Sequence, residues 1–464
     1  MKADNREGAV TQSLRAAIAN AGSEGRVPSV RALMAAHGVG PVTVQRAFAS
    51  LVREGLIEPR PGQGTFVRAA QAESSLPADL AWQSVALGAA RADGDLLAGL
   101  LGVPEEGSLV LSSGYLPPDL QATRLLATAM REVASKPALW DRTPADGLDA
   151  MRGWFASASA GLFSRHEVIV CSGGQSAIAA IVRALVPPGE TLLVEAPTYV
   201  GAIGAAHAAG LTLVPVPTDA AGVRPDLLDA AFRATGARVF YCQPTFANPT
   251  GAVLAPDRRA VVLQVLKDAR AFAIEDDWAR DLAFRPPPPT LASQDRDGHV
   301  VLIRSLAKSV APGLRVAAIM ARGAALARIR AMRASNDLFV SGVMQATALA
   351  VVTAPGWNRH LHAVRRTLGE RRDALVAAVR SELGSTSIHL VPDGGMHLWV
   401  RLSDTLSDVA LAGSLAREGV IVSAGRAWFP AEPPGPFLRL TFGASADVLR
   451  RGVVRIREAV ERYA

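Results

Sequence analysis

Short apolar runs alternate with longer helical patterns along the chain from about residue 107 onward. The apolar runs have the length of buried strands, and the segments between them are rich in Ala, Leu and Arg, as helices that cover a sheet often are. This alternation predicts an α/β domain with a doubly wound parallel sheet. The predicted strands are residues 167–171, 192–195, 239–243, 271–275, 300–304 and 316–320.

The first 68 residues follow a different pattern, with three helical segments and then a hairpin. Ser29 is a good N-cap for the second helix, and Gly40-Pro41 opens the third with proline at a position that needs no N–H. Three helices and a hairpin in this order predict a winged helix-turn-helix, whose third helix presents its N-terminal side chains to the major groove of DNA. The predicted elements are residues 11–21, 30–36, 41–54, 56–60 and 65–68.

The two patterns are separated by a stretch that is small, polar and contains proline. A chain of 464 residues is too long for one ordinary core, so more than one domain is expected. Residues 79–101 have a helical pattern, which predicts a docking helix within the linker. We therefore expect a winged helix-turn-helix domain at 1–68, a linker with a docking helix at 69–106 and the α/β domain at 107–464.

Positive charge is concentrated at the N-terminal end. The formal net charge is +7 and the pI is near 10.0, and residues 1–70 contain nine Lys or Arg against five Asp or Glu. More than half of the excess charge therefore lies on the predicted winged helix-turn-helix, which favours DNA as its partner. A small helical bundle for protein contacts is the alternative, because the exposed face is only modestly basic.

Composition argues against a membrane protein and a disulfide-stabilised secreted protein. The longest uncharged stretch, residues 338–357, contains Ser, Gln, Thr, Pro and Gly and predicts a buried helix and a turn. The N-terminus has no apolar segment typical of a secretory signal, so we expect a cytoplasmic protein. Cys171 and Cys242 each lie in an apolar run, which predicts buried thiols, and no ligand spacing indicates a metal site.

Four motifs occur in order in the N-terminal region: Pro28-Ser29-Val30-Arg31-x-Leu33, Gly38-Val39 with Thr43-Val44, Leu51-x-x-Glu54-Gly55-Leu56 and Gly62-Gln-Gly64-Thr65-Phe66-Val67. Together they resemble the DNA-binding domain of the GntR family over almost all of residues 10–68. The resemblance implies that the third helix and the wing tip contact DNA. One difference is Gly40-Pro41, where members commonly have Ser-Arg, so neighbouring side chains have to supply more of the contact. The implied DNA-binding residues are Arg31, Thr43, Gln45, Arg46, Gly62, Gly64 and Thr65.

Lys308 lies between two predicted strands, in the run Ser305-Leu-Ala-Lys308-Ser-Val-Ala-Pro-Gly-Leu-Arg315. A lysine amine condenses with an aldehyde cofactor only when it can be neutral, and a cofactor phosphate needs a fixed cation and hydroxyl donors nearby. Lys308, Arg315 and Ser305 supply these groups. The alternative is an ordinary basic stretch on a solvated loop, but the Pro-Gly turn and the apolar strand that follows favour a binding site.

Further candidate residues lie in or at the ends of other predicted strands, where ligands bind in doubly wound sheets. The run 172–176, Ser-Gly-Gly-Gln-Ser, joins a strand to a helix whose N-terminus can hold a phosphate. Tyr199 offers an aromatic face to a planar ring, and Asn248 offers an amide donor. Asp276 requires a cationic partner, and Arg439, within an apolar strand, requires a carboxylate from a substrate or from an internal Asp or Glu.

In this order the motifs resemble the fold-type I, aspartate-aminotransferase-like enzymes that use pyridoxal 5′-phosphate (PLP), over roughly residues 107–464. The resemblance implies a mostly parallel doubly wound sheet with a smaller C-terminal α+β subdomain. It implies that Lys308 is the catalytic lysine that bonds to the cofactor, that Asp276 pairs with the pyridine nitrogen, and that Arg439 binds the substrate α-carboxylate. The other implied cofactor-binding residues are Ser305, Arg315, Gly174 and Gln175 at the phosphate, Tyr199 against the ring, and Asn248 and Trp278 near its O3′.

Two positions differ from the family pattern. Trp278 stands where the family usually has a Tyr that donates to O3′, so the electronic properties of the ring are expected to differ. Near Trp140-Asp-Arg142, where many members place a Tyr that reaches the phosphate of the neighbouring subunit, this chain has no Tyr.

A GntR-like module followed by an aminotransferase-like domain resembles the MocR-type regulators. In that group the large domain senses PLP or an amino-acid-type ligand, and the small one binds DNA, usually in a domain-swapped homodimer. The resemblance thus implies a PLP-dependent transcriptional regulator with DNA and an amino acid or amine as partners. A true aminotransferase with an accessory DNA-binding module is the alternative, because the residue set for transamination is nearly complete.

Overall fold

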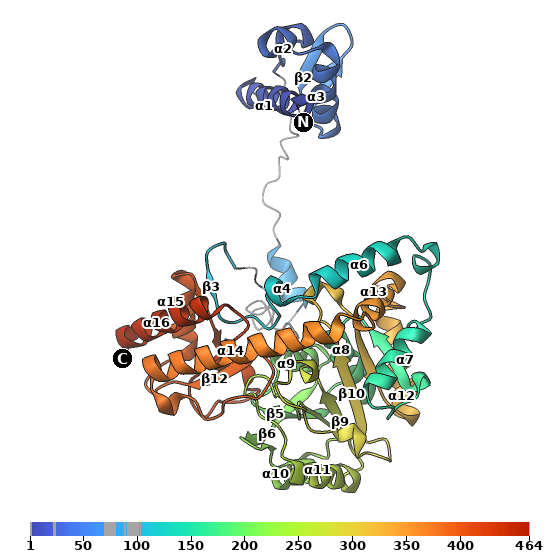
Figure 1. The fold of residues 1–464 in the computed structure, drawn as a ribbon, viewed down its shortest axis with the longest axis vertical. Coiled ribbons are helices and arrows are strands. Elements are labelled where there is room, and N and C mark those ends of the chain that lie inside the picture. The colour runs from blue at the N-terminus through green and yellow to red at the C-terminus, as the bar shows by residue number, and fades with distance from the viewer. Residues whose placement is uncertain are drawn as a thin grey trace. The chain divides into compact units, whose positions relative to one another are not determined.

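The computed structural model divides into two compact units, Met1–Gly88 and Ala89–Ala464 (Figure 1). Among the residues that the structure describes, no helix is long and apolar enough to cross a membrane. The structure describes residues 2–21, 25–68, 80–87, 90, 102 and 104–463.

The small unit has three helices and a two-stranded antiparallel hairpin, as predicted. The first helix begins at Lys2, earlier than its apolar spacing indicated. Ser29 caps α2, because its Oγ accepts a hydrogen bond from the N–H of Ala32 at 3.2 Å. The elements are α1 (Lys2–Ala21), α2 (Val30–His37), α3 (Pro41–Arg53), β1 (Ile57–Arg60) and β2 (Gly64–Val67).

One face of α3 is buried against the rest of this unit. Val44, Ala47 and Leu51 are inaccessible to solvent and pack in a cluster with Leu14 of α1 and Leu33 of α2. This spacing of three and four residues places one stripe of the helix inward and leaves the other side in solvent. The core therefore fixes which side of α3 can meet a partner.

A short helix, α4 (Ala81–Leu87), lies within the segment predicted as a linker with a docking helix. Trp82, Val85 and Leu87 are 63%, 86% and 79% exposed, so α4 carries apolar side chains that the described part of the chain does not cover. Most of the remaining predicted helix, residues 88–101, lies outside the described residues.

The large unit is built on an eight-stranded sheet in the order β4-β11-β10-β9-β8-β5-β6-β7. Strands β10, β9, β8, β5 and β6 are parallel, whereas β11 is antiparallel between β4 and β10. All six predicted strands are present, and β6 and β7 are additional. The strands are β4 (Val168–Cys171), β5 (Thr191–Ala196), β6 (Thr212–Asp219), β7 (Gly222–Val223), β8 (Val239–Cys242), β9 (Phe272–Asp276), β10 (Val300–Ser305) and β11 (Ala317–Met320).

Helices cover both faces of this sheet (Figure 1). Val168 and Val170 of β4 belong to a buried cluster on one face, and Ile169 and Cys171 belong to another on the opposite face, as strand alternation requires. The predicted buried helix within residues 338–357 is α13. The helices are α6 (Thr123–Ala134), α7 (Asp149–Ala158), α8 (Gly174–Leu185), α9 (Val200–Ala208), α10 (Pro225–Thr235), α11 (Pro256–Asp268), α12 (Gly323–Asp337), α13 (Gly342–Val352) and α14 (Trp357–Leu383).

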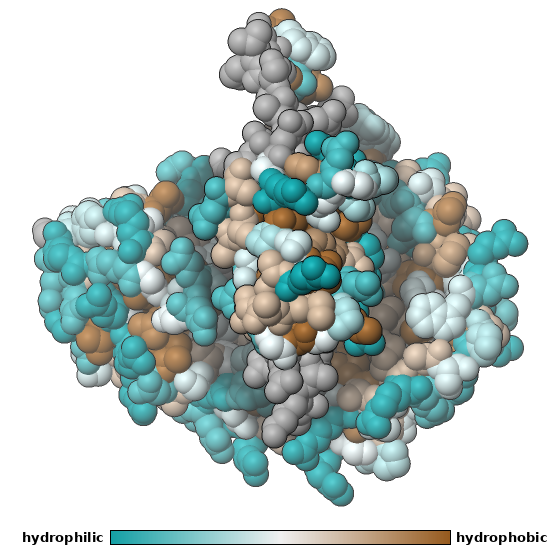
Figure 2. All heavy atoms as spheres, turned by 90° about the horizontal axis from the view of Figure 1, so that it is seen from above, coloured by the Kyte–Doolittle hydropathy of each residue, from teal (hydrophilic) through white to brown (hydrophobic). Residues whose placement is uncertain are grey.

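A smaller α+β subdomain follows the long helix α14, as predicted. Its main sheet has the order β12-β15-β14. A separate parallel pair joins β3, from the beginning of the large unit, to β13. In Figure 2, hydrophilic residues lie along much of the rim of the visible face, with apolar groups between them. The elements are β3 (Leu109–Val110), β12 (His397–Arg401), α15 (Asp408–Arg417), β13 (Val420–Ile421), β14 (Ser423–Ala424), β15 (Phe437–Thr441) and α16 (Ala446–Tyr463).

Candidate functional site

One pocket of the large unit lies beyond the carboxyl ends of the parallel strands. Its walls come from the segments that follow β4, β5, β8, β9 and β10, so residues far apart in sequence meet there. All nine residues predicted to bind a cofactor line this pocket. The lining residues are Tyr115, Gly174, Gln175, Ile178, Tyr199, Gln243, Asn248, Asp276, Trp278, Ser305, Ala307, Lys308 and Arg315.

Lys308 follows β10, and its amine lies inside the pocket. Its Nζ donates to the carbonyl oxygen of Gly114 at 2.7 Å and lies 3.8 Å from the centre of the Tyr115 ring. Loss of water, followed by repulsion from Arg439, lowers the pKa of this amine to about 7, although Asp276 opposes the shift. A substantial fraction of the amine is therefore neutral near pH 7, which is the form that attacks a carbonyl carbon.

Asp276 ends β9, and its carboxylate is 4% exposed. Its Oδ2 accepts hydrogen bonds from the Tyr241 hydroxyl at 2.7 Å and from Nε2 of Gln243 at 2.8 Å. Burial raises the pKa of Asp276, which means that the carboxylate lacks enough compensating charge in this environment. A cation in the pocket, such as a protonated ring nitrogen, would stabilise the ionised form.

The loop between β4 and α8 forms a candidate phosphate cradle. Gly173 has φ +100°, and a Cβ at this position would lie 2.5 Å from the guanidinium of Arg315. Arg315 reaches this loop and donates to the carbonyl oxygen of Ser172 at 3.2 Å. Gly174 begins α8, so its N-terminal N–H groups and a fixed guanidinium lie together beside Ser305. These are groups that bind phosphate oxygens.

Arg439 lies in β15 and is 1% exposed. Its guanidinium donates to Asn248 Oδ1 at 3.3 Å and to the carbonyl oxygen of Ser112, and it lies 4.3 Å from the centre of the Trp428 ring. Burial lowers the pKa of Arg439 to about 9.

None of the ion pairs formed by the described residues includes Arg439, so the internal carboxylate that was considered as an alternative partner is not there. Its Nε also has no hydrogen-bond partner, so a ligand carboxylate would complete this environment.

Trp278 forms part of the wall of the pocket. Its Nε1 donates to the carbonyl oxygen of Phe246 at 3.0 Å, so the indole N–H is already bonded to the backbone. The ring stacks on His397, with centroids 5.5 Å apart and planes 21° apart. His397 in turn lies 3.4 Å from Arg439, between Nε2 and NH1. Trp278 thus lines the pocket as predicted. Its N–H bonds to the backbone, whereas the Tyr usual in the family donates to O3′.

Tyr199 and Gln175 meet at the start of two neighbouring helices. Tyr199 precedes α9, and burial raises the pKa of its hydroxyl well above the usual range. Gln175 donates from Nε2 to the carbonyl oxygen of Gly201 at 2.7 Å, whereas its Oε1 has no partner. Both side chains line the pocket, and an aromatic face and an amide oxygen are available to a ligand there.

The unpredicted side chains of this site include Tyr115, Tyr241, Gln243 and His397. Gln243 connects two predicted residues, since its Nε2 donates to Asp276 and its Oε1 accepts from the N–H of Asn248 at 2.8 Å. A polar residue at the end of the apolar run 239–243 was a usable signal for Gln243. The other three follow no local motif, because their roles depend on contacts between distant segments.

The residues present in this pocket fit PLP. A buried carboxylate without sufficient positive charge, a glycine cradle against Arg315 and a lysine with a lowered pKa match the pyridine nitrogen, the phosphate and the aldehyde of that cofactor. This match rests on donors and acceptors that the described part of the chain leaves incompletely satisfied.

The candidate nucleic-acid interface is on the small unit, at α2, at the N-terminus of α3 and at the wing. Arg31, Gln45 and Arg46 are exposed, and in the described ranges their side chains form no hydrogen bond or ion pair. Thr43 is half-buried beside them on the first turns of α3. These side chains are therefore available to a partner.

The wing tip is the turn between β1 and β2. Gly62 is exposed and has φ +73°, and Gly64 and Thr65 are half-buried. The prediction missed Arg26, which is exposed and lies against the wing: a Cβ at Gly64 would be 2.8 Å from its Nε. Arg26 thus adds a positive charge beside Gly64 of the wing.

Two family models match the chain. The model for aminotransferase class I and II matches residues 109–456, and the model for bacterial regulatory proteins of the gntR family matches residues 7–67. These two ranges correspond to the two units of the structure.

Curated relatives share both parts. The vitamin B6 salvage pathway transcriptional repressor PtsJ of Salmonella typhimurium is 28% identical over 92% of this chain and 91% of its own length. The probable rhizopine catabolism regulatory protein MocR of Rhizobium meliloti is 27% identical over 94% of this chain and 89% of its own.

Among solved structures, the α-aminoadipate aminotransferase LysN of Thermus thermophilus, complexed with N-(5′-phosphopyridoxyl)-L-leucine, has a TM-score of 0.74 at 25% identity. The match covers 82% of this chain and 98% of LysN.

Proposed function

We propose that this chain is a transcriptional regulator that binds DNA through the small unit and senses an amino acid or amine at the PLP pocket. The chain belongs to the aminotransferase class I and II family, carries a gntR-family module before that domain, and has PLP as its cofactor. The full-length similarity to MocR and PtsJ supports a regulator over a stand-alone enzyme.

The observation that carries the proposal is Arg439. This guanidinium is buried, has no carboxylate partner among the described residues and donates to Asn248, which lines the pocket, although Arg439 itself is not one of the lining residues. A buried cation without a counter-charge is unfavourable unless an anion binds there. An α-carboxylate is such an anion, and the neighbouring pocket can receive the rest of an amino acid.

Bound PLP supplies an aldehyde carbon that amines attack. Lys308 is the amine that holds the cofactor in the protein, and its lowered pKa keeps part of it neutral near pH 7. Asp276 would hold a proton on the ring nitrogen, while Gly174 and Arg315 would hold the phosphate. Arg439 would bind the carboxylate of an amino acid whose amine is directed toward Lys308.

Regulation follows if the liganded and unliganded pockets favour different arrangements of the protein on DNA, because a ligand shifts an equilibrium only through different affinity for the two states. We propose that these arrangements are those of a domain-swapped homodimer. Trp140 and Leu338 are 67% and 69% exposed, and the bond from Thr143 Oγ1 to the Val340 carbonyl oxygen joins their segments. This apolar area is a suitable contact for a second copy.

The test is DNA binding to the region upstream of the protein's own gene, with and without PLP and a panel of amino acids. The proposal expects the affinity or the footprint to change with one or more of these ligands. Specific DNA binding that no ligand alters would contradict ligand sensing, and absence of specific DNA binding would contradict the regulator.

An active aminotransferase is the second candidate, because the pocket contains Lys308, and Arg439 contacts the pocket residue Asn248 without a carboxylate partner among the described residues. Measurement of keto-acid formation from the same panel of amino acids separates the two. Multiple turnovers favour the enzyme, whereas a single change in the cofactor spectrum without turnover favours the sensor.

A further inference from the structure

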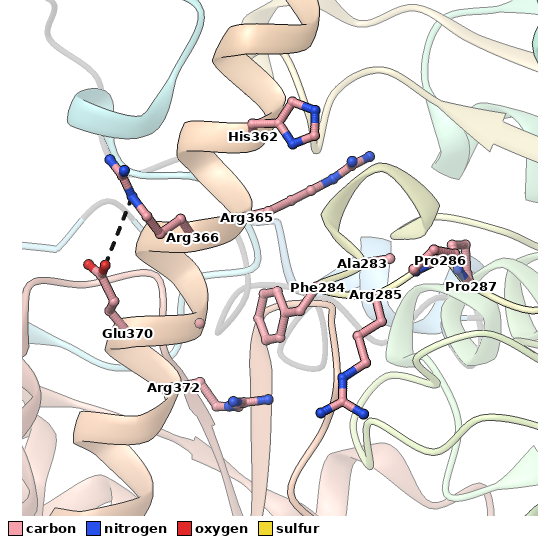
Figure 3. Close-up of a pocket in the computed structure, with 11 residues that line it drawn as sticks. Ala283, Phe284, Arg285, Pro286, Pro287, His362, Arg365, Arg366, Glu370 and Arg372 are labelled. Carbon is pink, nitrogen blue, oxygen red and sulfur yellow. Dashed lines mark ion pairs between the residues drawn. The ribbon is translucent and has the colours of Figure 1, made fainter.

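The arginines of the large unit differ in how firmly they are held. Figure 3 shows a cleft along α14 in which Arg285, Arg365 and Arg366 extend in different directions. Arg285 and Arg366 are exposed, whereas Arg439 is 1% exposed and has contacts at both of its terminal nitrogens. A ligand carboxylate would therefore meet the guanidinium of Arg439 in one orientation, which is set by the groups that contact it.

His397 is one of these groups. It begins β12, is 3% exposed, and its Nε2 lies 3.4 Å from NH1 of Arg439. A guanidinium only donates hydrogen bonds, so Nε2 has to accept and the imidazole proton has to be on Nδ1. In the described part of the chain Nδ1 has no partner. A buried donor without an acceptor is unfavourable, so the bond to Arg439 is what favours this tautomer.

The surroundings of His397 exclude its doubly protonated form. Burial, followed by repulsion from Arg439 and Lys308, holds the pKa of His397 well below its usual range. The other acceptors of the guanidinium, Asn248 Oδ1 and the carbonyl oxygen of Ser112, are uncharged as well. The positive charge of Arg439 is thus oriented by its neighbours without being neutralised, and it stays available to a carboxylate.

Trp278 connects His397 to the wall of the pocket. The indole and imidazole rings stack with centroids 5.5 Å apart and planes 21° apart. Trp278 is itself fixed, because its Nε1 donates to the carbonyl oxygen of Phe246 at 3.0 Å. Gly394 leaves room for the Phe246 ring, since a Cβ at that position would collide with it. A pocket wall therefore holds the imidazole that contacts Arg439.

We propose that His397 is a positioning residue for Arg439: its neutral Nε2, held by the stack on Trp278, fixes the guanidinium in the orientation that binds the α-carboxylate of an amino acid. The proposal rests on the proposed sensing of an amino acid at the PLP pocket. It adds the residue through which the pocket distinguishes an amino acid from the amine that lacks the carboxylate, because only the carboxylate needs an oriented guanidinium.

The first test is the tautomer of His397 in the full chain loaded with PLP. Nitrogen-15 NMR of protein labelled at histidine distinguishes a protonated ring nitrogen from an unprotonated one, and His397→Gln identifies the signals of His397. We expect the proton on Nδ1. A proton on Nε2 would mean that the imidazole does not accept from Arg439, and would overturn the proposal. This result does not depend on whether the protein senses an amino acid.

The second test separates the acceptor from the ring. His397→Phe keeps a ring against Trp278 but has no acceptor, whereas His397→Gln keeps an acceptor near the position of Nε2 but has no ring. The probes are the twenty standard L-amino acids and, for each one that changes the PLP spectrum of the parent, the amine that lacks its carboxylate. Spectral titration measures the affinity for both.

His397→Phe is expected to bind the amino acid about tenfold more weakly, as loss of one hydrogen bond to a charged group predicts, and to bind the amine as the parent does. His397→Gln should recover most of the affinity for the amino acid. The matched control is His389→Phe, which replaces an exposed histidine before β12 and should bind both probes like the parent. The PLP content of each variant is measured in the same samples.

An equal loss for the amino acid and the amine in His397→Phe, or parent-like binding of the amino acid, would overturn the positioning role. If His397→Phe does not fold, His397→Asn takes its place, because its amide reaches only the position of Nδ1. If no amino acid changes the spectrum of the parent, the proposed sensing fails, and the tautomer alone decides whether His397 orients Arg439. If amino acids bind and the difference from the amine does not appear, the sensing stands and the role of His397 fails.

Discussion

The two units present their functional groups in opposite ways. On the small unit, Arg31, Gln45 and Arg46 are exposed and have no partner in the described ranges, which is the usual condition of surface side chains. In the large unit, Asp276 and Arg439 are buried and form no ion pair with any residue that the structure describes, which is rarely tolerated. The ligand of the large unit can therefore be inferred from the buried charges of its structure, whereas the DNA-binding role of the small unit is inferred from its fold and motifs.

The largest effect is expected at Lys308. Lys308→Ala removes the amine that bonds to PLP, so borohydride reduction should leave no covalently attached cofactor while the fold is retained. Mass spectrometry of the reduced protein measures this, and Lys136→Ala and Lys267→Ala serve as controls that keep the link. A persistent link in Lys308→Ala would mean that another lysine bonds to PLP. It would contradict the inference that the buried Lys308 is the partner.

Arg439→Ala should remove the response to an amino acid while PLP stays bound through Lys308 and Arg315. Loss of a buried charge-assisted pair predicts at least about 30-fold weaker amino-acid binding, or about 2 kcal/mol. Spectral titration measures the affinity, and the PLP content of the same samples is the control. If the variant responds like the parent, the ligand is PLP alone or an amine without a carboxylate.

The rate at which PLP attaches to the cofactor-free protein should depend on pH. The pKa of Lys308 is about 7, so the amine is mostly protonated below that pH, and the attachment rate should fall about tenfold for each pH unit below it. Above pH 7 the rate should level off. Arg439→Met should move the midpoint to higher pH, because the Arg439 charge lowers the pKa of Lys308. If the midpoint does not move, the charge of Arg439 does not affect the pKa of Lys308.

The smallest effects are expected on the exposed side. Arg31→Ala and Arg46→Ala should each weaken DNA binding about fivefold without changing PLP content. Arg53→Ala, at the opposite end of α3, is the matched control. Fluorescence anisotropy over a range of salt concentrations separates a phosphate contact, which lowers the salt slope, from a base contact. If all three variants bind DNA as tightly as the parent does, the small unit is a protein-binding module instead.

Most of the fold could be predicted because its strands are continuous apolar runs. Strand β6 was missed because Pro215 and Pro217 interrupt its pattern, and proline is tolerated only where a strand does not need every N–H. The antiparallel direction of β11 was not predicted either, since periodicity shows where a strand lies but not its direction.

The candidate site was predictable where residues form local motifs. Lys308, Arg315 and Ser305 lie within one short run, and Gly174 follows a strand directly. Tyr241 and His397 could not be found in this way, because each is a single polar residue in an apolar strand. The role of Tyr241 arises only when the sheet brings it to Asp276, and the role of His397 arises only when it meets Arg439.

The antiparallel pairing of β10 with β11 also gives a criterion for comparing genomes. Ser305 is opposite Ala317, and the N–H of Leu306 donates to the carbonyl oxygen of Val316 at 3.0 Å, so the loop that carries Lys308 and Arg315 is closed at its base. An insertion or deletion within this loop would change the spacing of lysine and arginine without harming the sheet. Relatives in which the spacing between the lysine and the arginine differs are therefore expected to have lost the cofactor even where the sheet is intact.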